Sequence, residues 1–169
     1  MTSMVKLQCS AVPISHDDQG ILADDLEELL STWPQKYPDR PRPKALYAIT
    51  AGNNPRGYNW SEERMVDIYQ LCRKYNLLIL DDGAYYFVQF GQKRSRSFQS
   101  LDVDGRVIRF DTFSKIVGAG YRLGWASGPK SIIDKVTYDI QLTTIHANAY
   151  SQALKCLADL IREQKGAEQ

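Results

Sequence analysis

The sequence contains few residues of the kinds that bind metals or form disulfides. Three cysteines, Cys9, Cys72 and Cys156, stand far apart along 169 residues, and there are only two histidines. The odd number and wide spacing of the cysteines match neither a disulfide framework nor a metal site, so we predict reduced thiols in a cytoplasmic protein. A metal centre rich in histidine is not expected.

The chain also lacks a strong net charge and any long apolar run. A formal net charge of +1 gives no reason to expect nucleic acid or an anionic membrane as a partner. No apolar run approaches the roughly 20 residues of a membrane span, and the N-terminal MTSMVKLQCS has no signal-peptide apolar core. We therefore expect no nucleic-acid partner, no membrane partner and a cytoplasmic location.

What the sequence does contain is the composition of a globular domain. Hydrophobic residues make up 43% of the chain and charged residues 24%, and the length is sufficient for one hydrophobic core. Residues 1–169 are therefore interpreted as a single domain.

Apolar patterning predicts an alternation of helices and strands. Ser61 is the predicted N-cap of a helix over 62–75, whose buried side would consist of Met65, Ile68, Tyr69 and Cys72. Pro34 is predicted to end the first helix. The other predicted elements are helices at 21–33, about 130–142 and 147–164, and strands at 45–50, 77–80, 106–110 and 124–128. This order predicts an α/β three-layer sandwich with a mostly parallel sheet.

Three predicted strands are each followed by unusual polar residues. Asn54 follows the first, Asp82 the second, and the group Thr112, Ser114 and Lys115 the third. Taken singly these signals are weak, because Asn-Pro is common in turns, paired aspartates are common in caps, and lysines are common on surfaces. In open α/β sheets, however, ligands bind beyond the carboxyl ends of the strands. The three polar groups together predict a site at that edge.

The same residues lie in three ordered motifs that resemble a known family. NNPRG (53–57) is similar to the Asn-Pro-Thr-Gly motif of class I/II aminotransferases, with Arg56 in place of threonine. DDGAYYFVQF (81–90) resembles their Asp-x-x-Tyr block, and DTFSKIVGAGYRLGW (111–125) their Ser-x-Ser-Lys block with a downstream arginine. From about residue 11 to 160 the chain resembles these fold type I enzymes, especially the kynurenine/2-aminoadipate and fungal aromatic aminotransferases.

The resemblance implies pyridoxal 5′-phosphate (PLP) as cofactor and gives each motif residue a role. Lys115 would be the catalytic residue, forming a Schiff base with the cofactor aldehyde and moving a proton. Asp82 would keep the pyridine nitrogen protonated, as an electron-withdrawing ring requires. Tyr85 and Asn54 would bind the phenolic oxygen. Thr112, Ser114 and Arg122 would bind the phosphate, where the arginine fork suits two oxygens.

The resemblance also implies a function and its limits. The expected reaction moves an amino group between an amino acid, aromatic or 2-aminoadipate in type, and a 2-oxo acid, in amino-acid or secondary-metabolite biosynthesis. Family members are typically more than twice as long, so residues 1–169 would form only part of the large PLP-binding domain, without the small C-terminal domain. The substrate-binding arginine of that domain would then be missing, and apolar faces would be uncovered. A homodimer or a complementary subunit is expected to complete the site.

Other functions remain open at this point. Lyase or decarboxylase chemistry uses the same cofactor motifs. A truncated homologue without catalytic activity, acting as a binding or assembly partner or having no activity, is the alternative from a different class. A small-nucleotide-binding α/β domain is disfavoured, because no Gly-x-Gly-x-x-Gly follows a first strand.

Overall fold

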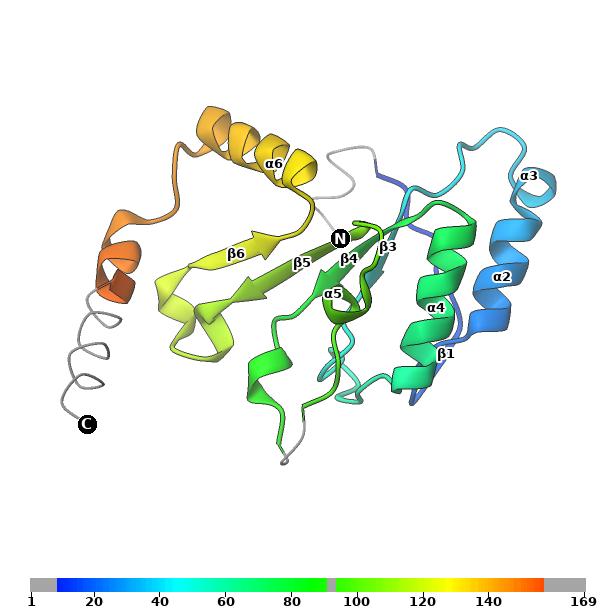
Figure 1. The fold of residues 1–169 in the computed structure, drawn as a ribbon, viewed down its shortest axis with the longest axis horizontal. Coiled ribbons are helices and arrows are strands. Elements are labelled where there is room, and N and C mark those ends of the chain that lie inside the picture. The colour runs from blue at the N-terminus through cyan, green and yellow to red at the C-terminus, as the bar shows by residue number, and fades with distance from the viewer. Residues whose placement is uncertain (1–8, 91–93, 157–169) are drawn as a thin grey trace.

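A four-stranded sheet forms the centre of the structure, a computed structural model that describes residues 9–90 and 94–156. Its strands are β3 (Ala45–Ala48), β4 (Leu78–Asp82), β5 (Val107–Thr112) and β6 (Gly124–Ser127), and they lie side by side in that order (Figure 1). β3, β4 and β5 are parallel, whereas β6 pairs antiparallel with β5. The prediction of an α/β fold with a mostly parallel sheet is confirmed. Each predicted strand agrees with an observed one within two residues at each end.

The N-terminal part begins with a short hairpin and two helices. β1 (His16–Asp17) pairs antiparallel with β2 (Gly20–Ile21), and α2 (Ala23–Ser31) and α3 (Trp33–Lys36) follow. The prediction that Pro34 ends the first helix was wrong. That helix ends at Ser31, and Pro34 lies in the first turn of α3. Proline is tolerated there because N–H groups of a first helical turn have no partner within the helix.

Helix α4 (Glu62–Lys74) follows the predicted pattern closely. The side chain of Ser61 accepts a hydrogen bond from the backbone N–H of Arg64 at 3.2 Å, which satisfies one of the free donors at the helix start. The four residues predicted to be buried, Met65, Ile68, Tyr69 and Cys72, are the buried residues of this helix. The apolar face of α4 therefore sets its position against the sheet.

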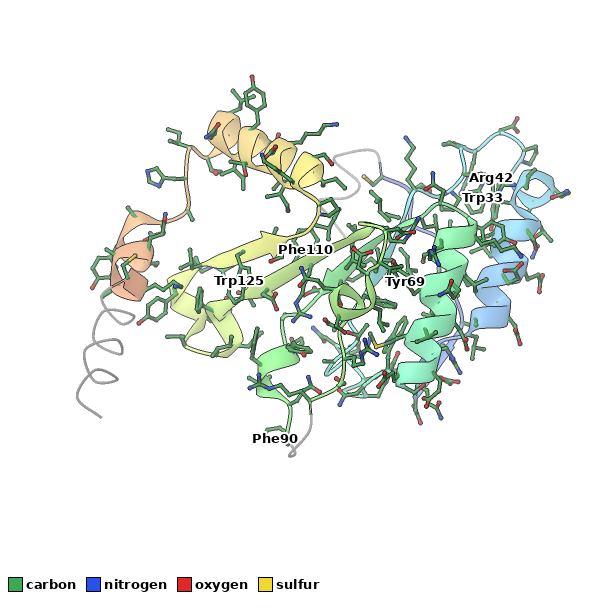
Figure 2. All side chains as sticks on the ribbon, in the orientation of Figure 1. Trp33, Arg42, Tyr69, Phe90, Phe110 and Trp125 are labelled. Carbon is green, nitrogen blue, oxygen red and sulfur yellow. The ribbon has the colours of Figure 1, made fainter. Side chains whose placement is uncertain are left out.

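The hydrophobic core lies between one face of the sheet and helices α2, α4 and α5 (Phe98–Leu101). Alternation along each strand decides which side chains enter it. In β3, Leu46 and Ala48 are buried, while Tyr47 points to the opposite face and is 51% exposed. Phe110 of β5, which is labelled in Figure 2, shares that opposite face through the strand register. It is 38% exposed. The sheet face away from the core therefore carries exposed aromatic side chains.

The chain after β4 contains several short helical turns before its last helices. Three 3-10 turns, η1 (Tyr86–Val88), η2 (Phe113–Lys115) and η3 (Ala119–Tyr121), follow the carboxyl ends of β4 and β5. α6 (Lys130–Thr143) lies beyond β6, away from α2 (Figure 1), and confirms the helix predicted at about 130–142. Residues 149–156 are also helical, and the rest of the helix predicted at 147–164 lies outside the described residues.

Candidate active site

The carboxyl ends of the parallel strands bring the predicted site residues to one edge of the sheet. Asp82 is the last residue of β4, Thr112 the last of β5, and Asn54 lies in the turn that follows β3. Because the three strands run in the same direction, these positions meet at the same edge. The fold therefore gathers three segments that are separated by up to about 60 residues in the sequence.

Tyr85 lies at the centre of this edge. Its hydroxyl accepts a hydrogen bond from the Asn54 side-chain amide, with 3.4 Å between Nδ2 and Oη. On another side, Lys115 Nζ stands 5.4 Å from the centroid of the Tyr85 ring, within the range of a cation–π contact. Lys115 itself is exposed. One tyrosine thus contacts both the amide and the amine that the motifs singled out.

Asp82 is held by two donors, one on each carboxyl oxygen. Oδ2 accepts a hydrogen bond from the Tyr47 hydroxyl at 2.5 Å, and Oδ1 accepts one from the backbone N–H of Ala84 at 3.1 Å. Sequence reasoning missed Tyr47. The register pairs Tyr47 with Leu80, so Asp82, two residues further along β4, projects from the same face. That alternation was the available signal.

The hydroxyls of Thr112 and Ser114 are neighbours, with 3.0 Å between their oxygens. Thr112 is the N-cap of η2, and its side chain accepts a hydrogen bond from the backbone N–H of Ser114 at 3.1 Å. This cap sets the direction in which the chain leaves β5, and with it the position of Lys115 one residue later. Two hydroxyls and an amine therefore occupy a single turn.

Arg122 lies on the returning side of the same loop. It has left-handed backbone angles, with φ of 49°, and its Nη1 donates to the carbonyl oxygen of Ala119 at 3.2 Å. Within residues 9–90 and 94–156, no hydrogen bond joins Arg122 to Thr112 or Ser114. The two sides of the loop nevertheless meet next to Arg122, because the backbone N–H of Phe113 donates a hydrogen bond to the carbonyl of Leu123 at 3.0 Å.

A buried ionic cluster lies on the helix-facing side of the strand ends, and sequence reasoning missed it. Arg109 is sandwiched between Asp111 and Asp81, and all three side chains are at most 6% exposed. Burial raises the pKa of Asp81 to about 6, opposed by the charge of Arg109 and a hydrogen bond from Thr50. Buried charges need partners, so the charged Arg109 inside the strand predicted at 106–110 was the signal that could have revealed this cluster.

Comparison with known proteins decides the family. The model of the family described as aminotransferase class I and II matches residues 3–165. The chain belongs to this family. It is 43% identical over 151 residues to the bovine (Bos taurus) mitochondrial kynurenine/alpha-aminoadipate aminotransferase, covering 88% of this chain and 36% of the relative.

Solved structures of aminotransferases share the fold of this family member. The Candida albicans aminotransferase Aro8 superposes with a TM-score of 0.84 at 34% identity, over 91% of this chain and 36% of that one. The Thermus thermophilus alpha-aminoadipate aminotransferase LysN, complexed with N-(5′-phosphopyridoxyl)-L-leucine, superposes with a TM-score of 0.78 at 25% identity, over 92% and 38%. The chain thus spans about a third of the length of the aminotransferases it matches.

Three further observations concern the described part of this aminotransferase-family chain. In the part of the chain that the structure describes, no helix is long and apolar enough to cross a membrane, and no group of three or more metal-ligating side chains occurs. A cavity of about 280 Å³ lies between the start of α4 and the segment around Gln89 and Arg96, and none of the predicted site residues lines it. The candidate site lies outside this cavity, and three of its residues are exposed: Asn54, Lys115 and Arg122.

Proposed function

We propose that the whole protein is a PLP-dependent aminotransferase that acts on amino acids of the aromatic or 2-aminoadipate type. The amino group of the amino acid would pass to a 2-oxo acid. The amino acid would thereby become a 2-oxo acid, and the 2-oxo acid would become an amino acid. Membership of the class I and II aminotransferase family supports this reaction. The names of the bovine kynurenine/alpha-aminoadipate and the fungal aromatic and tyrosine aminotransferases support the substrate class.

The observation that carries the proposal is the position of Tyr85 between Asn54 and Lys115. An amide and a phenol whose polar atoms are 3.4 Å apart fit a single ligand oxygen that both groups bind. An amine beside them would bind an aldehyde carbon and hold or move a proton near it. When bound, PLP would supply an electron-withdrawing ring that stabilises negative charge on the substrate α-carbon. The residues present fit this cofactor.

The remaining site residues suit the two ends of the same cofactor. Asp82 would bind the ring nitrogen, since a carboxylate favours the protonated form of a nearby base. Thr112 and Ser114 offer two adjacent hydroxyls to phosphate oxygens. Arg122 would add a guanidinium, which keeps its charge and can bind two oxygens at once. For Arg122 this requires a side-chain rotation away from Ala119, to which it now donates.

The remaining expectations stay predictions about the whole protein. Residues 1–169 would form part of a large PLP-binding domain, completed by a second copy or a complementary subunit. A role in biosynthesis and a cytoplasmic location are likewise predictions, and the bovine, mouse and rat relatives are named as mitochondrial enzymes.

Cofactor titration with chemical trapping tests the proposal on the 169-residue chain. PLP is added until its visible absorbance stops changing. Sodium borohydride then reduces the carbon–nitrogen double bond that joins PLP to a lysine. The protein is digested, and the masses of its peptides are measured by mass spectrometry. We expect the cofactor's mass on the peptide that contains Lys115. Lys115→Ala should abolish this labelling, whereas Lys135→Ala, which changes an exposed lysine of α6, should leave it unchanged.

Two outcomes would contradict the proposal. One is an absorbance that does not change at saturating PLP, which would favour the homologue without cofactor chemistry. The other is labelling spread evenly over surface lysines, which would mean that Lys115 has no special reactivity.

A further inference from the structure

Arg109 makes an unusually complete set of contacts for a charged residue inside a sheet. Its Nε and Nη2 donate to the two carboxyl oxygens of Asp111, each at 2.8 Å, in a two-pronged grip. Its Nη1 faces Asp81 Oδ2 at 3.5 Å. The guanidinium also stacks on Tyr86, with 4.2 Å from its carbon to the ring centroid. The side chains of Arg109, Asp81 and Asp111 are 6%, 0% and 4% exposed.

These contacts join all three parallel strands at their carboxyl ends. Arg109 and Asp111 belong to β5 and Asp81 to β4. The segment after β3 is joined through Thr50, whose hydroxyl lies 3.4 Å from Asp81 Oδ1. Tyr86 adds the turn η1, which follows β4. Backbone hydrogen bonds join the strands only in pairs, β3 to β4 and β4 to β5. The side-chain cluster instead links all three segments at one place.

The members of the cluster are neighbours in sequence of the proposed cofactor-binding residues. Asp81 precedes Asp82, Asp111 precedes Thr112, and Tyr86 follows Tyr85. Asp81 and Asp111 are buried strand residues, Tyr86 contacts Arg109 from η1, and the neighbour of each belongs to the site. A shift of Arg109 would therefore be transmitted through one peptide unit to three separate site residues.

Gly83 shows how closely the cluster is packed beneath the site. A methyl group at this position would lie 2.5 Å from Asp111 Oδ1 and 2.7 Å from Arg109 Nη2. The backbone between Asp82 and Tyr85 thus rests directly on the Arg109–Asp111 pair. The backbone at Gly83 therefore belongs to the site on one side and contacts the cluster on the other.

We propose that Arg109 is a positioning residue that fixes the relative placement of Asn54, Asp82, Tyr85 and Thr112 for cofactor binding. This inference rests on the proposed function. A buried ion cluster is weak support for stability alone, because removing the charges from water costs about as much as their attraction returns. A planar fork that holds two carboxylates and an aromatic ring at fixed angles gives orientation, which a lysine cannot reproduce.

Arg106 offers a matched control on the same segment of chain. It also grips an aspartate with two nitrogens, Nε and Nη2 to Asp104 at 2.8 and 3.0 Å, and its Nη1 donates to the carbonyls of Leu77 and Cys72. Its side chain is 14% exposed. It precedes β5, at the end of the sheet opposite the site. Replacing either arginine should therefore lower the stability of the fold. Only the replacement of Arg109 should also disturb the positions of the site residues.

The first measurement is the dissociation constant for PLP in Arg109→Lys and Arg106→Lys, with thermal midpoints recorded for both. We expect Arg109→Lys to weaken binding by about tenfold or more, in the range seen when outer partners of a bound metal are removed. The PLP dissociation constant of Arg106→Lys should stay within about twofold of the parent value, even if its thermal midpoint falls as much as that of Arg109→Lys. Equal weakening in the two variants would overturn the proposal. If Arg109→Lys does not fold, the fully uncharged Asp81→Asn/Arg109→Met/Asp111→Asn variant replaces it, with the same expectation.

A second measurement needs no cofactor and separates this inference from the proposed function. Amide hydrogen exchange of the unliganded chain reports local opening at residues 50–54, 82–86 and 112–115. We expect faster exchange in all three segments for Arg109→Lys and in none of them for Arg106→Lys. Unchanged exchange in Arg109→Lys would overturn the positioning role. If the unaltered chain binds no PLP, the proposed function fails, while the exchange result still decides this inference.

Discussion

The hydroxyl of Tyr47 donates a hydrogen bond to Asp82 Oδ2 at 2.5 Å and joins β3 to β4 on the face away from the helices. Burial of the hydroxyl and its bond to Asp82 raise the pKa of Tyr47 above the usual value near 10. The phenol therefore keeps its proton across the neutral range, and Asp82 keeps a constant donor there.

Replacing Tyr47 by phenylalanine is expected to weaken PLP binding several-fold. Tyr47 is 51% exposed, so the free energy of unfolding should fall by only about 0.5 to 1.5 kcal/mol, the typical net value of one hydrogen bond. PLP titration and urea unfolding measure the two effects. Tyr138→Phe, at an exposed position of α6, should change neither quantity. Unaltered PLP affinity in Tyr47→Phe would show that this donor does not orient Asp82.

Gly83→Ala is expected to destabilise the fold because its methyl group would overlap Asp111 and Arg109. Overpacking of a buried site costs about 1 to 3 kcal/mol, which urea unfolding would detect. Gly120→Ala is the matched change in an open position, since no atom lies within 4 Å of its added methyl group. Its stability should remain close to that of the parent. Similar losses in both variants would argue against close packing at Gly83.

The buried carboxyl of Asp81 is expected to make stability fall as pH rises. Its pKa lies near 6 in the folded chain, above the ordinary 3.8, so the folded state binds more protons between these values. The stabilisation is present below pH 3.8 and is lost as pH rises through 6. Asp81→Asn lacks this titration, so its stability relative to the parent should increase by about 1 to 3 kcal/mol from pH 4 to pH 7. Denaturant unfolding at several pH values tests this, and a difference independent of pH would contradict it.

The helix α4 provides a neighbouring pair of positions with opposite expectations. Met65 is 1% exposed in the core, and Met65→Ala should lower the free energy of unfolding by about 2 to 5 kcal/mol. Val66, the next residue, is 39% exposed, and Val66→Ala should cost only about 0.5 kcal/mol. Urea unfolding of both variants tests the assignment. Equal losses would mean that α4 is rotated relative to the sheet.

Sequence patterns predicted the parts of this protein that depend on local periodicity. The buried residues of α4 and the Ser61 cap were foreseen, because helical spacing and capping act within a few residues. The proximity of Asn54, Tyr85 and Lys115 also followed from strand ends and family motifs. In these cases the relevant chemistry lies in a short segment or at a recognisable strand end.

Other features depend on register, which the sequence leaves open. The strand predicted at 45–50 was given no inner and outer face, although its alternate residues face different sides. Arg109 was given no role within the strand predicted at 106–110, and only the pairing of β4 with β5 places it opposite Asp81. Pro34 was predicted to end a helix, but the first turn of a new helix tolerates proline equally well, and the sequence does not distinguish the two.

The loop that carries both the lysine and the arginine is closed at its base by contacts within residues 112–124. Thr112 pairs with Gly124, and the bond from Phe113 to Leu123 closes the loop just inside that pair. The separation of Lys115 from Arg122 is therefore set by this neck, where β5 and β6 pair, and by the turn between them. Chain length can change around Gly120, where space is open, without moving the neck. Shortening or lengthening the turn would therefore leave the start of the lysine segment and the end of the arginine segment joined at the same place.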